Sequence, residues 1–186
     1  MVALAQLWLP ILLSAVLVFI ASSLVHMVIK WHNSDYWKLP NEDEVRAAIQ
    51  KGNPAPGQYV TPYCMDMKEA QSPEMQKKYA DGPVGLFYLK KPGPMNMGPQ
   101  LGGWFGFNVV IAFFVAYVCA HTLAAGTPYL QVFRVAGCVC FLAYAGGEVP
   151  AAIWMGKPWK VAFKEVADSL FYGLLTGGAF GWLWPK

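Results

Sequence analysis

The sequence predicts an all-α polytopic membrane protein with four transmembrane helices and a small α/β-like insertion between helices 1 and 2. Two observations lead to this fold class. Hydrophobic residues make up 56% of the 186-residue chain, compared with roughly 45–50% in a soluble domain. They also gather in four continuous stretches, each close to the roughly 20 residues that cross a bilayer core as a helix. Stretches without period-two alternation favour helices over the strands of a barrel.

The first span is expected within residues 1–29, where Leu7–Val28 is continuously apolar. No basic region precedes this stretch, and it is longer than the roughly 7–15 apolar residues of a secretory signal. The sequence therefore favours a retained helix. The other three spans are expected within residues 104–186, at about 104–123, 129–149 and 161–184.

Residues 30–103 are expected to form the extramembrane insertion. Asn41 and Ser72 are each followed by acidic residues, the pattern of a capped helix start. Two runs rich in β-formers follow Gly57 and Pro83 and read as strands. The predicted elements are helices over 42–51 and about 73–82, and strands over 58–61 and 84–89.

The positions of the basic residues predict the topology. Of fourteen lysine and arginine residues, nine lie in the insertion and three, Lys157, Lys160 and Lys164, lie where the third span leads into the fourth. The positive-inside rule then predicts a cytoplasmic insertion and two external termini, in a bacterial inner membrane. Acidic residues are interleaved with the bases and the net charge is only +3. This pattern argues against nucleic acid as a partner, leaving the lipid bilayer and other membrane subunits.

Five ionisable residues are expected near the cytoplasmic ends of the spans. Such residues are costly in a membrane and often mark functional sites. Imidazoles and carboxylates gathered at one depth can bind a divalent metal such as zinc, iron or manganese, or relay a proton. Alternatively, His26 caps a helix or hydrogen-bonds at the interface, and the carboxylates of spans three and four pair with Lys157, Lys160 or Lys164. The candidate residues are His26, His32, Asp35, Glu148 and Asp168.

The insertion also carries a group of sulfur-containing residues. Thiolates and thioethers are soft ligands that select Cu(I), so this group predicts a copper site as a further alternative. Methionine also fills irregular apolar gaps, which is the other interpretation. The residues are Cys64, Met65, Met67, Met75, Met95 and Met97.

Gly173, Gly177 and Gly181 form two overlapping small-xxx-small frames on one face of the fourth span. Small residues at this spacing let two helices approach closely. This face is therefore expected to contact another helix. The partner helix can belong to the same chain, to a second copy or to another subunit.

The sequence contains no complete catalytic or cofactor motif. It lacks Cys-x-x-Cys-His, Cys-x-x-Cys, Gly-x-x-x-x-Gly-Lys, His-Glu-x-x-His and Gly-x-Ser-x-Gly. By exclusion, the sequence predicts a non-catalytic accessory or structural subunit of a larger bacterial membrane complex. The alternatives are a metal-binding or proton-handling membrane protein using the His/carboxylate cluster, and a copper-handling protein using the Cys/Met loop.

Overall fold

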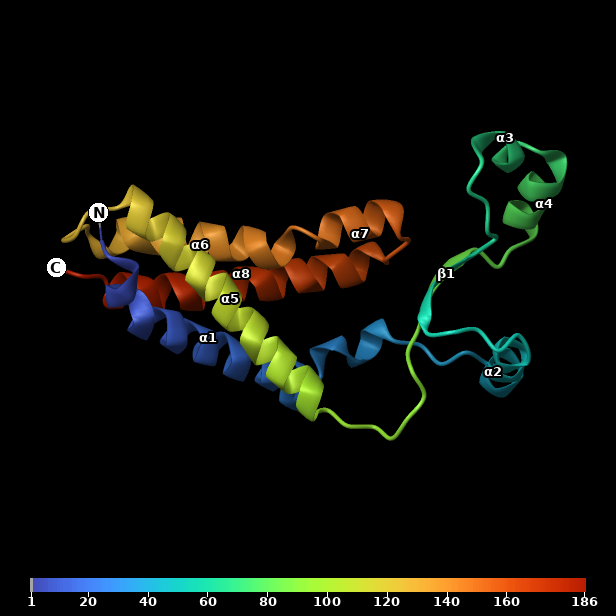
Figure 1. Ribbon diagram of the computed structural model, residues 1–186, viewed down its shortest axis with the longest axis horizontal. Helices are drawn as coiled ribbons and strands as arrows, with labels where there is room; N and C mark the ends of the chain where they lie inside the picture. The colour runs from blue at the N-terminus through green and yellow to red at the C-terminus, as the bar shows by residue number, and fades with distance from the viewer. Residues whose placement is uncertain (1) are drawn as a thin grey trace. The chain divides into compact units, whose positions relative to one another are not determined.

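The computed structural model describes residues 2–186 and is mostly helical (Figure 1). The chain divides into two compact units. The helical unit comprises the residues up to Tyr36 together with Asn96–Ala152 and Lys157–Lys186. The loop unit comprises Trp37–Met95 and Ile153–Gly156. Each unit is described separately below.

Four long helices form the helical unit. The first begins with a 3₁₀ turn and ends in a π-helical segment, η2, which a short 3₁₀ helix, η3, follows. A glycine pair separates α6 from the short helix α7. The elements are η1 (Leu4–Leu7), α1 (Trp8–Ser23), η2 (Leu24–Ile29), η3 (Trp31–Asp35), α5 (Gly98–Thr122), α6 (Tyr129–Ala145), α7 (Glu148–Trp154) and α8 (Trp159–Trp182).

Three of these helical stretches are long and apolar enough to cross a membrane: Leu4–Ile29, Gly98–Thr122 and Tyr129–Trp154. The predicted fourth span forms α8 but is not among them, so a four-span fold is not confirmed. Ionisable residues in the first half of α8 and glycines in its second half lower its mean hydropathy. The second helix also begins earlier than expected, at Gly98 instead of near Trp104.

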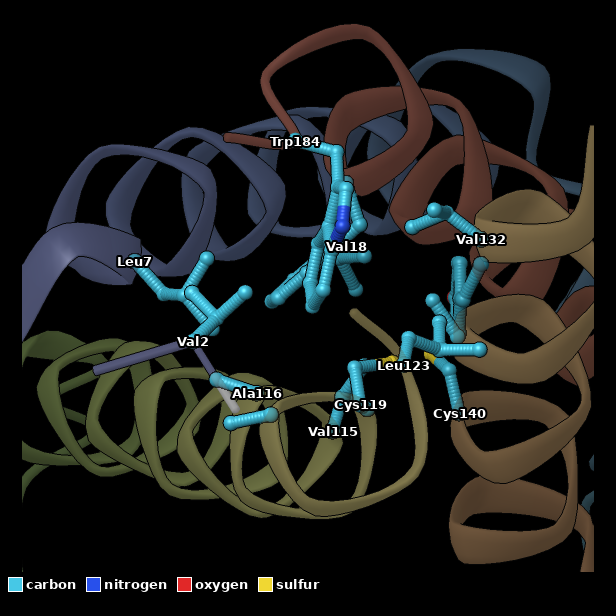
Figure 2. Packing of buried hydrophobic residues seen from close by; sticks show 14 of the residues in the cluster. Val2, Leu7, Val18, Val115, Ala116, Cys119, Leu123, Val132, Cys140 and Trp184 are labelled. Carbon is cyan, nitrogen blue, oxygen red and sulfur yellow. The ribbon is translucent and has the colours of Figure 1, made fainter. Parts of the chain in front are cut away.

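The core of the helical unit lies between α1, α5, α6 and α8. Figure 2 shows apolar side chains from these helices and from the chain ends pointing toward one another. Phe180, Val115 and Val132 are fully buried in this cluster. At the same end of the bundle, the Trp184 indole donates a hydrogen bond to the Ala124 carbonyl oxygen (2.9 Å). This bond ties the chain after α8 to the loop between α5 and α6.

The glycine face of α8 contacts α6 of the same chain. A Cβ atom added at Gly173 would lie 2.8 Å from the Gly137 carbonyl oxygen, and one at Gly177 would lie 2.7 Å from the Phe133 carbonyl oxygen. At Gly181 the Tyr129 ring is equally close, at 2.8 Å. Only glycine allows the two backbones to approach this closely.

The loop unit contains the four elements predicted for the insertion. The helices are α2 (Glu42–Lys51) and α4 (Pro73–Asp81), with a one-turn helix α3 (Met67–Ala70) between them in sequence. Strands β1 (Gly57–Thr61) and β2 (Gly85–Leu89) pair antiparallel, with Tyr59 opposite Phe87. The Ser72 hydroxyl caps α4 as expected. The Asn41 side chain makes no capping hydrogen bond, so that part of the prediction is wrong.

Candidate metal centre

Three predicted site residues come together at one end of the helical unit. His26 lies in the π-helical segment η2, an irregularity that often marks functional positions in helices. Lys30 then adopts a left-handed backbone conformation (φ 56°), which ends this segment and leads directly into η3. His32 on η3 consequently stacks on His26, with ring centroids 4.5 Å apart and planes 10° apart. Asp168 reaches the same place from α8.

The three residues offer one nitrogen or oxygen ligand atom each, and these atoms lie within 4.8 Å of one another. His32 Nε2 donates to Asp168 Oδ2 at 2.8 Å. His32 and Asp168 are buried, at 6% and 7% exposure, whereas His26 is exposed. Two fixed groups and one accessible imidazole therefore converge on a common point.

Both imidazoles are oriented through their other ring nitrogen. His26 Nδ1 donates to the Ser22 carbonyl oxygen at 2.9 Å, and His32 Nδ1 donates to Asp35 Oδ2 at 2.7 Å. Because a carbonyl and a carboxylate can only accept, Nδ1 carries the proton in each ring. In His26, Nε2 is then the nitrogen that remains for a ligand, and in His32 Nε2 can bind one only after losing the proton that it donates to Asp168. A histidine that binds a metal is typically held by this kind of outer hydrogen bond.

Asp35 is held in turn by Lys164 of α8. The Lys164 ammonium donates to Asp35 Oδ1 at 2.5 Å, to the Trp31 carbonyl oxygen at 2.8 Å and to the Ser34 hydroxyl at 2.9 Å. The hydrogen bond from Lys164, reinforced by the one from His32, holds the pKa of Asp35 below its ordinary value. The Asp35 carboxylate is thus charged and fixes the His32 ring.

Two opposing effects act on the pKa of His32. Burial disfavours the charged form and by itself would lower the pKa. The hydrogen bonds to Asp168 and Asp35, together with the nearby charge of Glu165, outweigh burial and raise the pKa of His32 above its ordinary value of 6.5. When His32 is protonated, both ring nitrogens donate, and the raised pKa extends this form to higher pH than in a free histidine. Lys164 and His32 then alternate with Asp35 and Asp168, so that the buried charges balance.

The raised pKa predicts how stability depends on pH after divalent metals have been removed with a chelator. The folded state favours protonated His32, so its stabilisation is complete below about pH 6.5 and is lost as the pH rises through the folded-state pKa. We expect the thermal unfolding midpoint of the wild type to fall as the pH rises above about 6.5, and that of His32→Gln to change less. Parallel profiles of the two proteins would contradict this prediction.

A cleft of about 590 Å³ lies beside this group in the helical unit. His26 is part of its wall, so a molecule in the cleft can reach the His26 side of the cluster. The aromatic side chains of Trp104, Phe107, Tyr144 and Tyr172 line the cleft. Two carboxylates, Glu148 and Glu165, line it as well.

The other two residues of the predicted cluster take different places. Asp35 is in contact with His32 but orients it from outside the three-residue group. Glu148 is not a member of the group: it begins α7, where it forms an ion pair with Lys157. Pairing with lysine, the alternative interpretation, thus applies to Glu148, whereas Asp168 pairs with His32.

The sulfur-containing residues of the predicted copper site belong to different parts of the fold. Met75 is buried at 4% exposure within the loop unit, in agreement with methionine as a filler of apolar gaps. Cys64 donates through its sulfur to the Asp66 carbonyl oxygen. Met97 lines the cleft of the helical unit. The side chains of Met65, Met67 and Met95 are exposed.

Sequence reasoning did not identify Lys164, Ser22 or Glu165 as site residues. Lys164 lies four residues before Asp168, a spacing that predicts an ion pair between them. Asp168 instead bonds to His32 and Lys164 bonds to Asp35. Ser22 contributes a backbone carbonyl, for which side-chain patterns give no signal.

Comparisons with protein-family models, curated proteins and solved structures give no match to this chain.

Proposed function

We propose that this chain is a membrane protein that binds a divalent transition metal, zinc or iron(II), through His26, His32 and Asp168. The observation that carries the proposal is the convergence of their three ligand atoms within 4.8 Å, with Nδ1 of both imidazoles already occupied by outer partners. Two histidines and one carboxylate are a recurrent ligand set for both metals.

Metal binding requires a small rearrangement. His32 Nε2 and Asp168 Oδ2 are 2.8 Å apart, a hydrogen-bond distance, whereas two ligands of a tetrahedral ion at about 2.0–2.2 Å lie roughly 3.3–3.6 Å apart. Metal binding displaces the proton on His32 Nε2, because only the neutral imidazole is a ligand. The exposed His26 supplies the third ligand by a small movement of its ring.

The number of ligands favours a reactive site over a structural one. Structural zinc sites usually have four protein ligands, whereas catalytic sites have three and keep a position for water or substrate. Here the third ligand, His26, is part of the cleft wall. We therefore infer that an open coordination position faces the cleft, where the ion would act as a Lewis acid or activate a bound water.

The decisive variant is His26→Ala, with His121→Ala as its matched control. His121 also donates Nδ1 to the carbonyl oxygen four residues earlier, that of Tyr117 (2.7 Å), but it belongs to no such cluster in the described part of the chain. We expect His26→Ala to weaken zinc binding by more than the roughly 10–100-fold typical of losing an outer partner. His121→Ala should bind zinc like the wild type.

Binding is measured by competition with a chromophoric chelator in mild detergent, and Co²⁺ substitution reports ligand geometry. Asp168→Asn provides a second test that removes a different ligand. If the wild type binds zinc no better than either ligand variant, the metal function is wrong.

We also propose a four-span topology with the segment 30–97 on the cytoplasmic side of a bacterial plasma membrane. The charge bias of the loops supports it. Helix α8 has 24 residues and, at about 1.5 Å per residue, is roughly 36 Å long, enough for a hydrocarbon core of about 30 Å. Its ionisable residues Lys164 and Asp168 are paired within the bundle, which reduces the cost of placing them in a membrane.

Labelling of Cys64 tests this topology. An impermeant maleimide is expected to modify Cys64 only after the cells are permeabilised, with Cys64→Ser as the background control. The three other cysteines are free and lie on α5 and α6. Equal labelling of intact and permeabilised cells would reverse the orientation.

The role of accessory subunit and the copper site stay predictions. The glycine face that suggested a partner helix contacts α6 of the same chain, so it lends less support to an external partner. Glycines 102, 103 and 106 of α5 have open space beside them and leave room for one.

A further inference from the structure

We propose that the cleft of the helical unit binds a lipophilic organic cation, meaning an ammonium or phosphonium group with aromatic or alkyl substituents. The aromatic wall would hold the apolar substituents and Glu165 would provide the counter-charge. This inference concerns the chain without a bound metal, because a divalent ion at the neighbouring site would repel a second cation in the cleft.

The aromatic wall is a preassembled cluster. The Tyr144 ring lies 5.9 Å from that of Trp104 and 5.4 Å from that of Tyr172, measured between centroids. Hydrogen bonds fix two of the rings: the Trp104 indole donates to the Ser22 hydroxyl and the Tyr144 hydroxyl donates to Asn108 Oδ1, both at 2.8 Å. Rigid aromatic groups of this kind attract cations through their π faces.

The charged residues that line the cleft are acidic. Its lining includes two carboxylates and one imidazole but neither lysine nor arginine. Lys157 neutralises Glu148. Glu165 forms no ion pair within residues 2–186, and the hydroxyl of the adjacent Ser169 donates to its backbone oxygen, not to its carboxylate.

A carboxylate that has no ion-pair partner and lies beside apolar rings suits a cation that is itself weakly hydrated. A lipophilic cation meets this requirement, because its charge is spread over an apolar body and it loses little hydration on entering. An anion would face Glu165 across the cleft. The volume of about 590 Å³ lies within the range of sites for small organic ligands, roughly 300–1,000 Å³.

The experiment compares two ions of nearly equal size and opposite charge. Tetraphenylphosphonium and tetraphenylborate are each equilibrated by dialysis against chelator-treated protein in detergent, and binding to protein-free micelles is subtracted. We expect the phosphonium to bind at least about tenfold more tightly than the borate. Equal binding of the two ions would overturn the proposal, because it would reflect apolar partition alone.

Two variants locate the binding site. Glu165→Gln should reduce phosphonium affinity about tenfold, whereas Glu44→Gln, on α2 of the loop unit, should leave it unchanged. Trp104→Leu should weaken binding through the aromatic wall, a change that does not alter charge. Unchanged phosphonium binding in Glu165→Gln would overturn the proposal. Because the metal has been removed, failure here leaves the metal function intact, and loss of zinc binding in His26→Ala leaves this proposal intact.

Discussion

Replacing Gly177 by alanine is expected to destabilise the helical unit by roughly 1–3 kcal/mol. The added Cβ would lie 2.7 Å from the Phe133 carbonyl oxygen and 3.3 Å from the Gly137 Cα atom. Both are backbone atoms of α6, so no side-chain rotation relieves the contact. Helices α6 and α8 must separate to accept even one methyl group. Gly177→Leu should have a larger effect.

Gly178→Ala is the matched control on the same helix. Its Cβ would meet only the Tyr129 hydroxyl, at 3.8 Å, which is an ordinary contact. Both substitutions replace a helical glycine and gain about 0.5–1 kcal/mol from reduced backbone freedom in the unfolded chain. The control should therefore be neutral or slightly stabilising in thermal unfolding in the same detergent. If the two alanine variants unfold at the same temperature, the close approach of α6 and α8 is not what stabilises the bundle.

The elements of the loop unit could be predicted because their signals are local. Helices α2 and α4 and both strands lie within one residue of the expected bounds, since acidic first turns, a proline at the first helical position and flanking glycines act within a few residues. The missing cap at Asn41 shows that a helix can form with only part of its start signal.

The spans were less predictable because hydropathy does not locate helix ends. Helix α5 begins at Gly98, before the apolar stretch, and the third predicted span breaks at Gly146–Gly147. The polar and small residues of helix α8 are used inside the bundle. Its charged side chains bond to η3 and its glycines contact α6. Because these residues lie on the packed face of α8, the helix does not need a continuously apolar sequence.

His26, His32 and Asp168 were among the residues named from the sequence, but so was Glu148, which lies apart from them, and their geometry could not be predicted. His32 and Asp168 are 136 positions apart, and their hydrogen bond depends on the left-handed conformation of Lys30 between η2 and η3. No periodic pattern marks a left-handed lysine or a π-helical turn. The choice of partner for Lys164 likewise depends on tertiary structure, because Asp168 is near it in sequence while Asp35 is near it in space.

Replacing Lys164 by methionine is expected to lower the thermal unfolding midpoint by about 5 °C or more, because removing one partner of a buried ion pair leaves the other uncompensated. The Asp35 side chain is only 2% exposed and would keep His32 as its sole charged partner. The variant also loses the hydrogen bonds from Lys164 to Trp31 and Ser34, which attach η3 to α8. Methionine retains most of the aliphatic chain of lysine. The fall in the unfolding midpoint of Lys164→Met therefore reflects mainly the loss of the ammonium group.

The pH dependence distinguishes this effect from a general loss of packing. In the wild type, Lys164 lowers the pKa of Asp35, so this stabilisation is present above the ordinary value of 3.8 and is lost as the pH falls through the lower folded-state value. The deficit of Lys164→Met should therefore be full at neutral pH and shrink as the pH falls below about 4. Lys160→Met, one turn earlier on α8 and exposed, has no such partner within residues 2–186 and should show no deficit at either pH. A deficit in Lys164→Met that does not change with pH would mean that the lysine acts through packing, and that Asp35 does not depend on it to orient His32.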